Sequence, residues 1–506
     1  MFLLRRLDHV LNKVTMYRLV VYVLSVYLAI GLLLSFTGRL SLSGVGLITS
    51  LTLLLPICYL TNRVIGNLYP AARNTESWLI TALILCCIMP PATTKLKIIS
   101  VAVAGLIAMA SKYVLTIKQH HIFNPAAIAV FVIGLIGFTH ATWWIGSPSM
   151  LIFTLLGGFL IARKIRRLQL VFIFGVAALA VMLLIGLQHS QHVSTILATG
   201  FTSWPLVFFG TIMLTEPATM PTAYTNRMLF GLLVGALFSS QLRLGSIGSA
   251  PEAVLIIGNA FAYITEPRYK LRLKLKEKHR LSAQIYDYVF EADKQLTFKA
   301  GQYLEWTLPH QAVDGRGNRR SFTIASSPTE PDIHLGVKLY EPSSSFKRTL
   351  NALTPKDRIV ADQLAGDFCL PSDQTKKLVF MAGGIGITPF RSMLKYLVDT
   401  EEKRDVILFY MVNNRDEAVY QDVIKQAEDA FGLKTAYVVS QGELPIGGRG
   451  LVGRLTVEQL KQAIPDYANR HYYISGPNIM VEAYTQLLHK ADVPARHIVT
   501  DYFSGY

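Results

Sequence analysis

Residues 378–389 read LVFMAGGIGITP, an apolar run followed by a glycine-rich turn and then Thr-Pro. The apolar run predicts a strand that is buried on both faces. The glycines predict a tight loop, and the proline suits the first turn of a helix, which we expect over 388–398. Strand, glycine loop and helix in this order form the unit from which parallel, doubly wound sheets are built.

The same unit recurs toward the C-terminus. We expect strands over 406–411, 435–439 and 471–474, and helices over 417–430 and 457–464. Dinucleotides bind at the carboxyl ends of such strands, where helix N-termini and bare glycine backbone can approach a pyrophosphate. The sequence therefore predicts an α/β doubly wound NAD(P)-binding domain over residues 373–506.

Toward the N-terminus the apolar period changes to two. Residues 270–276 read KLRLKLK, which is typical of a half-buried strand and also of a basic strip beside lipid headgroups. Further short alternating strands are expected over 284–291, 301–308, 320–325 and 334–340. This pattern predicts a small antiparallel β-barrel over residues 266–372.

Residues 1–265 differ from the rest of the chain in composition. They contain 17 Lys and Arg but only four Asp and Glu, whereas residues 266–506 contain 32 and 29. About ten apolar runs of spanning or near-spanning length predict a polytopic α-helical membrane domain over 1–265. An all-soluble protein is excluded, because 51% of the 506 residues are hydrophobic and only 16% are charged.

The basic residues of this half gather in alternate loops. Counted over the expected loops and the N-terminal tail, thirteen fall on one side and four on the other. The positive-inside rule then places the N-terminus and the C-terminal half in the cytoplasm, with the protein in the cell inner membrane. The net charge of +16 belongs to loops that meet anionic lipid, and nucleic acid is not an expected partner.

Metal and haem chemistry find little support in the sequence. The four cysteines form no C-x-x-C or ferredoxin-like run, so neither an iron–sulfur cluster nor another metal site is predicted. Haem, the competing cofactor, needs histidines paired across helices. The histidines fall at loops and helix ends, which favours capping or snorkelling roles: His120, His121, His140, His189 and His192.

Two polar segments interrupt the apolar runs. Residues 120–127 read HHIFNPAA and residues 213–221 read MLTEPATMP. A proline frees a backbone carbonyl, and a carboxylate at membrane depth is costly unless it serves a site. One such segment in each five-span half indicates an internal repeat with a site at its interface, with Asn124 and Glu216 as candidate cofactor contacts. Ordinary helix caps near the headgroups are the alternative interpretation.

Together with Ser-Lys-Tyr at 111–113, these segments resemble a family of membrane flavin subunits, the D subunit of the Rnf complex and the B subunit of the sodium-pumping NADH:quinone reductase. The resemblance covers most of residues 75–265. It implies a ten-helix inverted-repeat bundle that carries electrons through flavins. That family attaches FMN covalently to a threonine, and Thr199 is the candidate here although the preceding glycine is missing. A non-covalent FMN or riboflavin and a quinone pocket stay open.

Two further motifs precede the glycine loop. Arg320-Ser321-Phe322-Thr323 offers a guanidinium for a diphosphate, an aromatic face for a flavin ring and a hydroxyl for its polar edge. Residues 343–347, SSSFK, are expected to begin a short helix whose free N–H groups and hydroxyls could bind phosphate. Taken singly, each motif is also typical of a basic strand end or an ordinary N-cap.

In this order and spacing, the motifs resemble the ferredoxin–NADP reductase-like family over essentially all of 270–506. The resemblance implies FAD contacts from Arg320, Ser321, Phe322, Thr323, Ser344, Ser345, Phe346 and Lys347. It implies contacts to the nicotinamide dinucleotide from Gly383, Gly384, Gly386, Thr388, Pro389, Gly476 and Pro477. Thr323 near flavin N5, Ser475 beside the nicotinamide and Asp501 are the implied catalytic residues, and Phe503 is expected to cover the flavin.

Three positions depart from that family's pattern. Phe322 stands where tyrosine is frequent, Ser475 where cysteine is common and Asp501 where glutamate is frequent, so we expect slower hydride transfer. Arg415, after the second sheet strand, is placed to pair with a 2′-phosphate, which favours NADPH over NADH, although a solvated turn has the same sequence.

The predicted function is a membrane-bound flavoprotein oxidoreductase. Electrons would pass from cytoplasmic NAD(P)H through FAD into the membrane domain, to a flavin, a quinone or a redox protein as acceptor. Two alternatives treat the helical domain as a transporter or as a simple anchor for the reductase.

Overall fold

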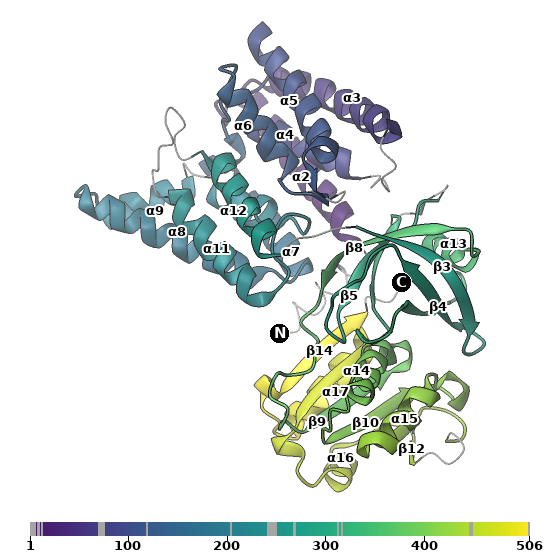
Figure 1. The fold of residues 1–506 in the computed structure, drawn as a ribbon. Coiled ribbons are helices and arrows are strands. Elements are labelled where there is room, and N and C mark those ends of the chain that lie inside the picture. The colour runs from purple at the N-terminus through teal and green to yellow at the C-terminus, as the bar shows by residue number, and fades with distance from the viewer. Residues whose placement is uncertain are drawn as a thin grey trace. The chain divides into compact units, whose positions relative to one another are not determined.

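The computed structural model describes residues 7, 11, 14–68, 76–117, 120–202, 205–239, 250–266, 270–310, 313–314, 317–444 and 449–503. The chain forms two compact units, Met1–Lys270 and Leu271–Tyr506, each with its own hydrophobic core (Figure 1). We refer to them as the helical unit and the reductase unit.

Each of the ten apolar runs of the helical unit contains a helix. The helices are α2 (Met16–Phe36), α3 (Gly44–Leu68), α4 (Ser77–Ile88), α5 (Lys95–Val114), α6 (Pro125–Leu135), α7 (Leu151–Lys164), α8 (Leu168–Gln188), α9 (Val193–Thr202), α10 (Leu206–Phe208), α11 (Tyr224–Ser239) and α12 (Pro251–Thr265). A π-helical turn over Phe209–Met213 continues α10.

Four helices in the described part of the chain are long and apolar enough to cross a bilayer. They are Met16–Phe36, Gly44–Gly66, Lys95–Val114 and Leu168–Gln188, and the pair Val193–Phe201 and Leu206–Met213, bent by 57°, would make a fifth. Other apolar helices are shorter because proline bounds them, as Pro125 does at the start of α6 and Pro251 at the start of α12.

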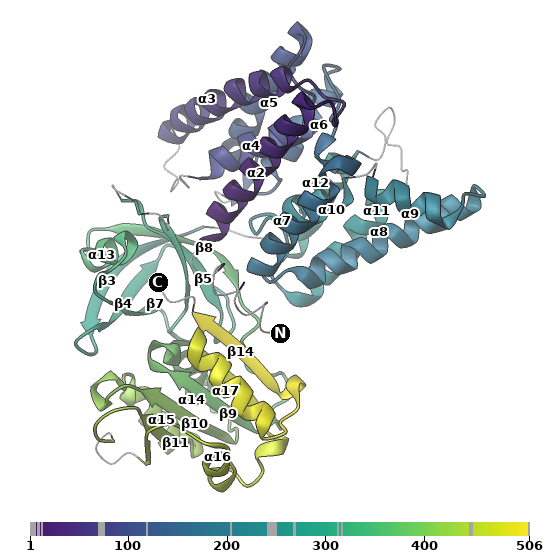
Figure 2. The ribbon, with the colours of Figure 1, turned by 180° about the vertical axis from the view of Figure 1, so that it is seen from behind.

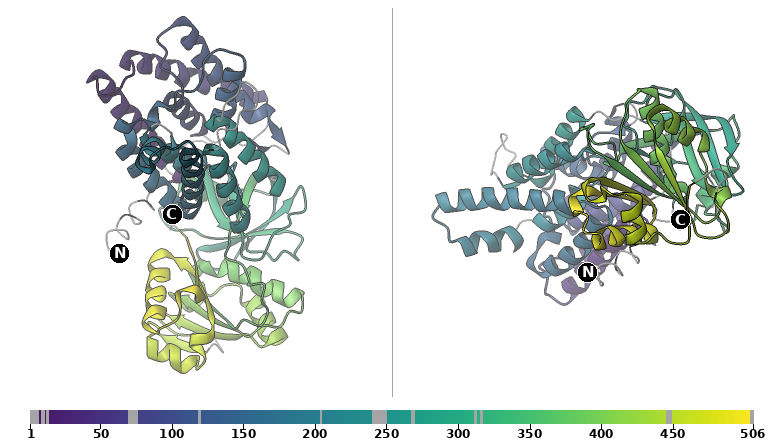
Figure 3. Two further views of the ribbon diagram at one scale, coloured as in Figure 1. Left: turned by 90° about the vertical axis from the view of Figure 1, so that its left-hand side faces the viewer. Right: turned by 90° about the horizontal axis from the view of Figure 1, so that it is seen from below.

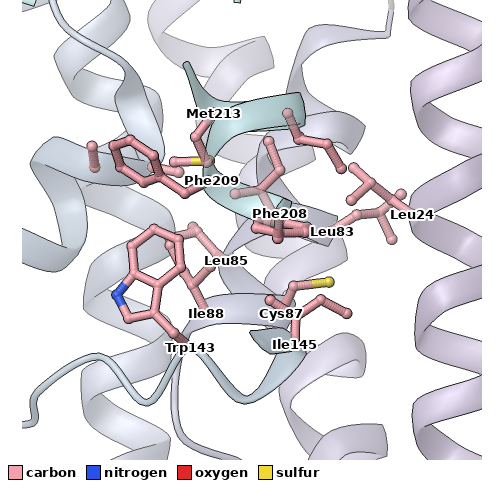
Figure 4. Close-up of a cluster of buried hydrophobic side chains, with 14 of the residues drawn as sticks. Leu24, Leu83, Leu85, Cys87, Ile88, Trp143, Ile145, Phe208, Phe209 and Met213 are labelled. Atoms are coloured by element: carbon pink, nitrogen blue, oxygen red, sulfur yellow. The ribbon is translucent and has the colours of Figure 1, made fainter. Parts of the chain in front are cut away.

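Aromatic rings fill the core of the helical unit. Trp143 lies against Phe208 and Phe209, with ring centres 6.4 and 6.1 Å away, and Phe209 stacks on Phe174 at 5.5 Å (Figure 4). Helices α8 and α11 pack closely because Gly235 has no side chain, and a Cβ there would lie 2.5 Å from the Phe174 carbonyl oxygen.

The reductase unit begins with a six-stranded antiparallel sheet. Its strands are β3 (Leu271–Arg280), β4 (Ile285–Ala292), β5 (Tyr303–Thr307), β6 (Arg319–Thr323), β7 (Ile333–Lys338) and β8 (Arg358–Ala365), in the order β6-β5-β8-β3-β4-β7. The sheet curls into a barrel, and the Ala325 amide donates to the His334 carbonyl between its two edge strands (Figure 2). Helix α13 (Ser345–Asn351) lies between β7 and β8 in sequence.

The second sheet of this unit is wholly parallel. Its strands are β9 (Leu378–Gly383), β10 (Val406–Val412), β11 (Lys434–Val439), β12 (Gly450–Val452), β13 (His471–Pro477) and β14 (Ile498–Phe503), in the order β12-β11-β10-β9-β13-β14. The chain runs outward from β9 to β12 and then returns to the other side of β9. The boundary between β9 and β13 is therefore the topological switch point, where such sheets bind ligands.

Helices cover both faces of the parallel sheet. Helices α14 (Thr388–Asp399) and α15 (Gln421–Phe431) lie on one face, and α16 (Val457–Ala463) and α17 (Asn478–Lys490) lie on the other (Figure 3). Side chains of the first pair pack with Phe380 and Leu408, and those of the second pair pack with Val379 and Phe409. Alternate residues of each strand thus face opposite helix layers, which confirms the predicted doubly wound NAD-binding fold.

Candidate functional site

The residues expected to hold FAD lie on strand β6 and at the start of α13. Arg320 donates from Nη1 to the backbone carbonyls of Gly317, at 3.2 Å, and of Arg319, at 2.6 Å. Its guanidinium carbon lies 5.4 Å from the centre of the Phe346 ring. These contacts hold the planar Arg320 guanidinium in place, and a guanidinium can pair with phosphate oxygens.

The Asp314 carboxylate contacts both Arg320 and Ser345, the first residue of α13. Asp314 Oδ2 accepts a hydrogen bond from the Ser345 backbone N–H at 2.7 Å, and Asp314 Oδ1 lies 3.9 Å from Arg320 Nη2. The Asp314 backbone N–H in turn donates to Ser345 Oγ at 3.0 Å. The donors assigned to a diphosphate thus already hold an anion, and their chemistry fits phosphate oxygens.

The other predicted FAD contacts surround this point. Ser344 caps α13 by accepting from the Lys347 backbone N–H at 3.3 Å. The buried Lys347 ammonium donates to the Lys338 carbonyl at 2.8 Å, so part of its hydrogen-bonding capacity is used within the barrel. The rings of Phe322 and Phe346, with centres 5.8 Å apart, give an apolar wall suited to a flat ring.

Two hydroxyls of β6 differ in exposure. Thr323 is buried and pairs with Tyr303 of β5, whereas Ser321 is exposed and pairs with Glu305. Of these two residues, Thr323 is therefore the one whose side chain is buried in the barrel wall.

The glycine loop after β9 passes very close to the end of β13. A Cβ on Gly386 would lie 2.4 Å from the Ser475 carbonyl oxygen, and one on Gly383 would lie 2.1 Å from Met480 Sδ. Gly384 has φ +52°, which favours glycine. The bare backbone leaves no side chain between this loop and a dinucleotide, so it fits the expected ligand.

The start of α14 completes the loop. Thr388 is buried and its Oγ1 donates to the Ile385 carbonyl at 3.1 Å, which tightens the turn, while Pro389 occupies the first turn of the helix.

Ser475 and Asp501 lie side by side at the carboxyl ends of β13 and β14, as a pair in parallel register. Ser475 is completely buried, and its Oγ has no hydrogen-bond partner among the residues described. A buried hydroxyl without a partner is costly, so its presence at the switch point suggests a ligand contact. Gly476 and Pro477 follow directly, and a Cβ on Gly476 would lie 3.0 Å from the Gly383 Cα. The Phe503 backbone pairs with Pro477, but its side chain lies outside the described residues.

Arg415 lies in a short 3₁₀ turn after β10, with its side chain 46% exposed. Its guanidinium lies 3.7 Å from the Asp416 carboxylate and 3.8 Å from that of Glu443. A 2′-phosphate would therefore compete with two carboxylates for this cation.

Buried polar contacts fasten the barrel to the parallel sheet. The Tyr420 hydroxyl donates to Asp287 Oδ1 at 3.1 Å, and burial raises the pKa of Tyr420 well above its usual value of 10. Arg391 of α14 makes a two-point ion pair with Glu330, with Nη2 and Oε1 2.8 Å apart. These contacts hold the flavin-binding and nucleotide-binding segments of the reductase unit in a fixed relation.

Comparison with known proteins places this site among redox enzymes. The oxidoreductase NAD-binding domain family matches residues 380–486. The chain is similar to the oxidoreductase NAD-binding domain-containing protein 1 of Xenopus laevis, with 29% identity over 41% of this chain and 71% of that protein. It is also similar to the reductase component of propane 2-monooxygenase from Rhodococcus jostii, with 26% identity over 41% of this chain and 56% of that protein.

The chain is an NAD(P)H-dependent oxidoreductase. Among solved structures, the Amycolatopsis cytochrome P450 reductase GcoB aligns with a TM-score of 0.42 and 21% identity, covering 47% of this chain and 72% of that one. All of these similarities concern the reductase unit.

In the helical unit, the structure brings Asn124 and Glu216 together. Asn124 Nδ2 donates to Glu216 Oε2 at 2.7 Å, and Asn124 Oδ1 caps α6 by accepting from the Ala127 N–H at 3.0 Å. Both side chains line one pocket. Thr199, by contrast, is exposed on α9 and donates to the Thr195 carbonyl at 2.9 Å, and it does not line that pocket.

The sequence did not single out two residues that matter here, Asn259 and Asp314. Asn259 accepts from the Asn124 backbone N–H at 2.9 Å and donates to the Thr219 carbonyl at 3.2 Å, so it joins the two proline-broken segments. Lys112, from the Ser-Lys-Tyr motif, donates to Ser77 Oγ at 2.7 Å. A polar residue inside an apolar helix was the available signal for Asn259.

Proposed function

We propose that this enzyme passes electrons from NAD(P)H through FAD in the reductase unit to a second redox ring, a flavin or a quinone, in the helical unit. The observation that carries the proposal is the pocket lined by Asn124 and Glu216, which lies in the same chain as the FAD- and NAD(P)H-dependent unit. FAD, when bound, accepts hydride from NAD(P)H and releases electrons singly.

Within the reductase unit, the residues divide by task. Arg320 and the start of α13 would bind the diphosphate, and Phe322 with Phe346 would seat the ring. Gly383–Pro389 would bind the nicotinamide dinucleotide at the switch point. Ser475 and Asp501 would position the nicotinamide, because they pair at the strand ends and Ser475 lacks another partner.

In the helical unit, the proposal is a membrane-embedded inverted repeat of ten helices in the cell inner membrane, with the reductase unit in the cytoplasm. Four helices of spanning length and the hydrogen bond between the two broken segments support it. The exposed position of Thr199 favours a non-covalent ring at Asn124 and Glu216 over attachment on α9.

Flavin content of the detergent-purified full-length protein tests the proposal, followed by anaerobic reduction with NADH or NADPH. We expect either a second flavin per chain that also bleaches, or one FAD and rapid reduction of a short-chain quinone. One FAD without quinone reduction would favour the anchor or the transporter. A protein without reducible flavin would overturn the assignment of the reductase site.

A further inference from the structure

Two pockets flank the contact between Asn124 and Glu216. The larger has about 640 Å³ of empty space up to its mouth and is lined by both residues and by apolar side chains such as Ile80 and Ile212. The smaller, of about 220 Å³, is lined by residues that include His121 and Asn259. Asn124 and Glu216 thus line the larger pocket, while Asn259, which accepts from the Asn124 N–H, lines the smaller one.

The two carboxylate oxygens of Glu216 have different surroundings. Oε2 accepts hydrogen bonds from Asn124 Nδ2 at 2.7 Å and from Thr219 Oγ1 at 3.2 Å. Oε1 lies 4.0 Å from His121 Nε2. One oxygen is thus held in place while the other faces an imidazole, at a separation that one water or a small rotation bridges.

The frame around this pair is rigid. Asn259 bonds both the Asn124 N–H and the Thr219 carbonyl, and it is 1% exposed. The titratable and charged groups that line the pockets or act on Glu216 are Tyr17, Lys112, His121, Tyr263 and Glu266. Of these, His121 is the one whose ordinary pKa lies near neutrality, which suits proton exchange at physiological pH.

We propose that Glu216 donates protons to a reducible ring in the larger pocket and that His121, which lines the smaller pocket, returns them. The inference rests on the proposed function, because the ring receives its electrons from NAD(P)H through FAD. A quinone and a flavin share the chemistry concerned, since both take up protons with electrons. Lys112 supplies the positive charge that offsets the carboxylate left after donation.

The step balances for a two-electron cycle. NAD(P)H loses a hydride, and the two electrons reach the ring while the accompanying proton leaves to water at the FAD. The Glu216 O–H bond breaks twice, each time forming one bond from hydrogen to the ring. After each donation the imidazolium of His121 reprotonates the carboxylate and then takes a proton from water.

The test compares Glu216→Gln, His121→Gln and the matched control Glu252→Gln in the full-length protein. Glu252 is also a buried carboxylate of the helical unit, bonded by Trp143 Nε1 at 3.1 Å, but it lines neither pocket. Ferricyanide reduction reports the reductase unit. Reduction of ubiquinone-1, or bleaching of a second bound flavin without added quinone, reports the helical unit and distinguishes the two rings.

We expect E216Q to reduce ferricyanide within about twofold of the wild-type rate but to lose at least tenfold in ubiquinone-1 reduction or second-flavin bleaching. H121Q should slow the same reduction at least tenfold while keeping or raising the solvent deuterium effect of the wild type, and added imidazole should restore the rate. The control should match the wild type. Should E216Q fold poorly, Glu216→Asp should keep the isotope effect at a reduced rate.

An E216Q or E216D protein with the wild-type rate and isotope effect would overturn the relay. A wild-type protein that neither holds a second flavin nor reduces ubiquinone-1 would overturn the proposed function instead. The two failures are therefore distinguishable.

Discussion

The side-chain amide of Asn124 donates to the Glu216 carboxylate over 2.7 Å, although 92 residues separate them in the sequence. Each residue precedes a proline that interrupts an apolar run, Pro125 and Pro217. Backbone groups in such interrupted segments need polar partners in an apolar surrounding, and Asn259 supplies one to each segment, at the Asn124 N–H and at the Thr219 carbonyl. The contact therefore joins the two halves of the helical unit at their least regular point.

Replacing Asn259 with leucine should destabilise the helical unit. The change leaves the Asn124 N–H and the Thr219 carbonyl buried without their partner, at a cost of about 1–3 kcal/mol for each group. Thermal unfolding in detergent should show a clearly lower midpoint. Asn226→Ala, which removes an amide bonded to Glu266, serves as a comparison at a half-exposed site and should have a smaller effect. Equal midpoints for the two variants would contradict this account.

Gly386→Ala should abolish productive binding of the nicotinamide dinucleotide. Its Cβ would lie 2.4 Å from the Ser475 carbonyl and 2.7 Å from the Gly476 Cα, so backbone must move at the switch point. We expect NADH reduction of FAD to fall at least tenfold while FAD stays bound, as measured by stopped-flow absorbance. Gly175→Ala, at an open helical position, is the control. Normal hydride transfer in G386A would show that the loop serves another purpose.

Ser475→Ala should separate stability from chemistry. Removing a buried hydroxyl that has no partner should leave the unfolding midpoint unchanged or slightly raised, whereas hydride transfer should slow about tenfold. Ser326→Ala should do the opposite, since Ser326 Oγ accepts from the His334 N–H at 3.1 Å and lies apart from the strand ends. The result against this prediction is an S475A enzyme with the wild-type hydride-transfer rate.

Glu443→Gln should improve the use of NADPH relative to NADH. Glu443 and Asp416 compete with a 2′-phosphate for Arg415, and loss of one exposed carboxylate is worth up to about 1 kcal/mol. We expect kcat/KM for NADPH to rise two- to fivefold, roughly, with little change for NADH. Arg415→Ala should lower the NADPH value selectively. An unchanged ratio of kcat/KM for NADPH to that for NADH in both variants would show that Arg415 does not contact the nucleotide.

The stability of the parallel sheet should fall in mild acid. Burial, reinforced by the neighbouring His497 ring 4.4 Å away, lowers the pKa of His471 below its ordinary 6.5. The unfolded chain then binds the proton more readily, so this stability is complete above pH 6.5 and is lost as the pH falls through the folded-state pKa. Hydrogen exchange of β13 should report the loss.

His471→Gln should flatten that pH dependence, whereas the exposed His489→Gln should leave it in place. A steep acid response that persists in H471Q would assign the effect to another group.

Periodicity explains which parts of the fold could be predicted. Strands β3 to β7 and β9 to β11 alternate or are wholly apolar, and their residues lie close to the expected ranges. Strand β14 was not among the expected strands, yet it pairs with β13, because pairing at a sheet edge is decided by tertiary contact.

Site residues that belong to a local sequence motif could be predicted. A residue that reaches the site from a distant part of the sequence could not. The glycine loop and the Arg320 motif are local in sequence, whereas Asn259 meets Asn124 across 135 positions. About ten apolar runs of spanning or near-spanning length were expected, and four helices of the described chain reach spanning length. The shorter ones stop where an apolar composition alone gives no signal, beside a proline.

Asp314 gives the barrel its own counterion. Since its carboxylate already lies against Ser345 and Arg320, these donors are occupied by the chain itself, and a cofactor diphosphate would replace one anion with another. Local charge would change little in that exchange. A diphosphate that bound the Ser345 N–H would therefore have to displace the Asp314 carboxylate from it.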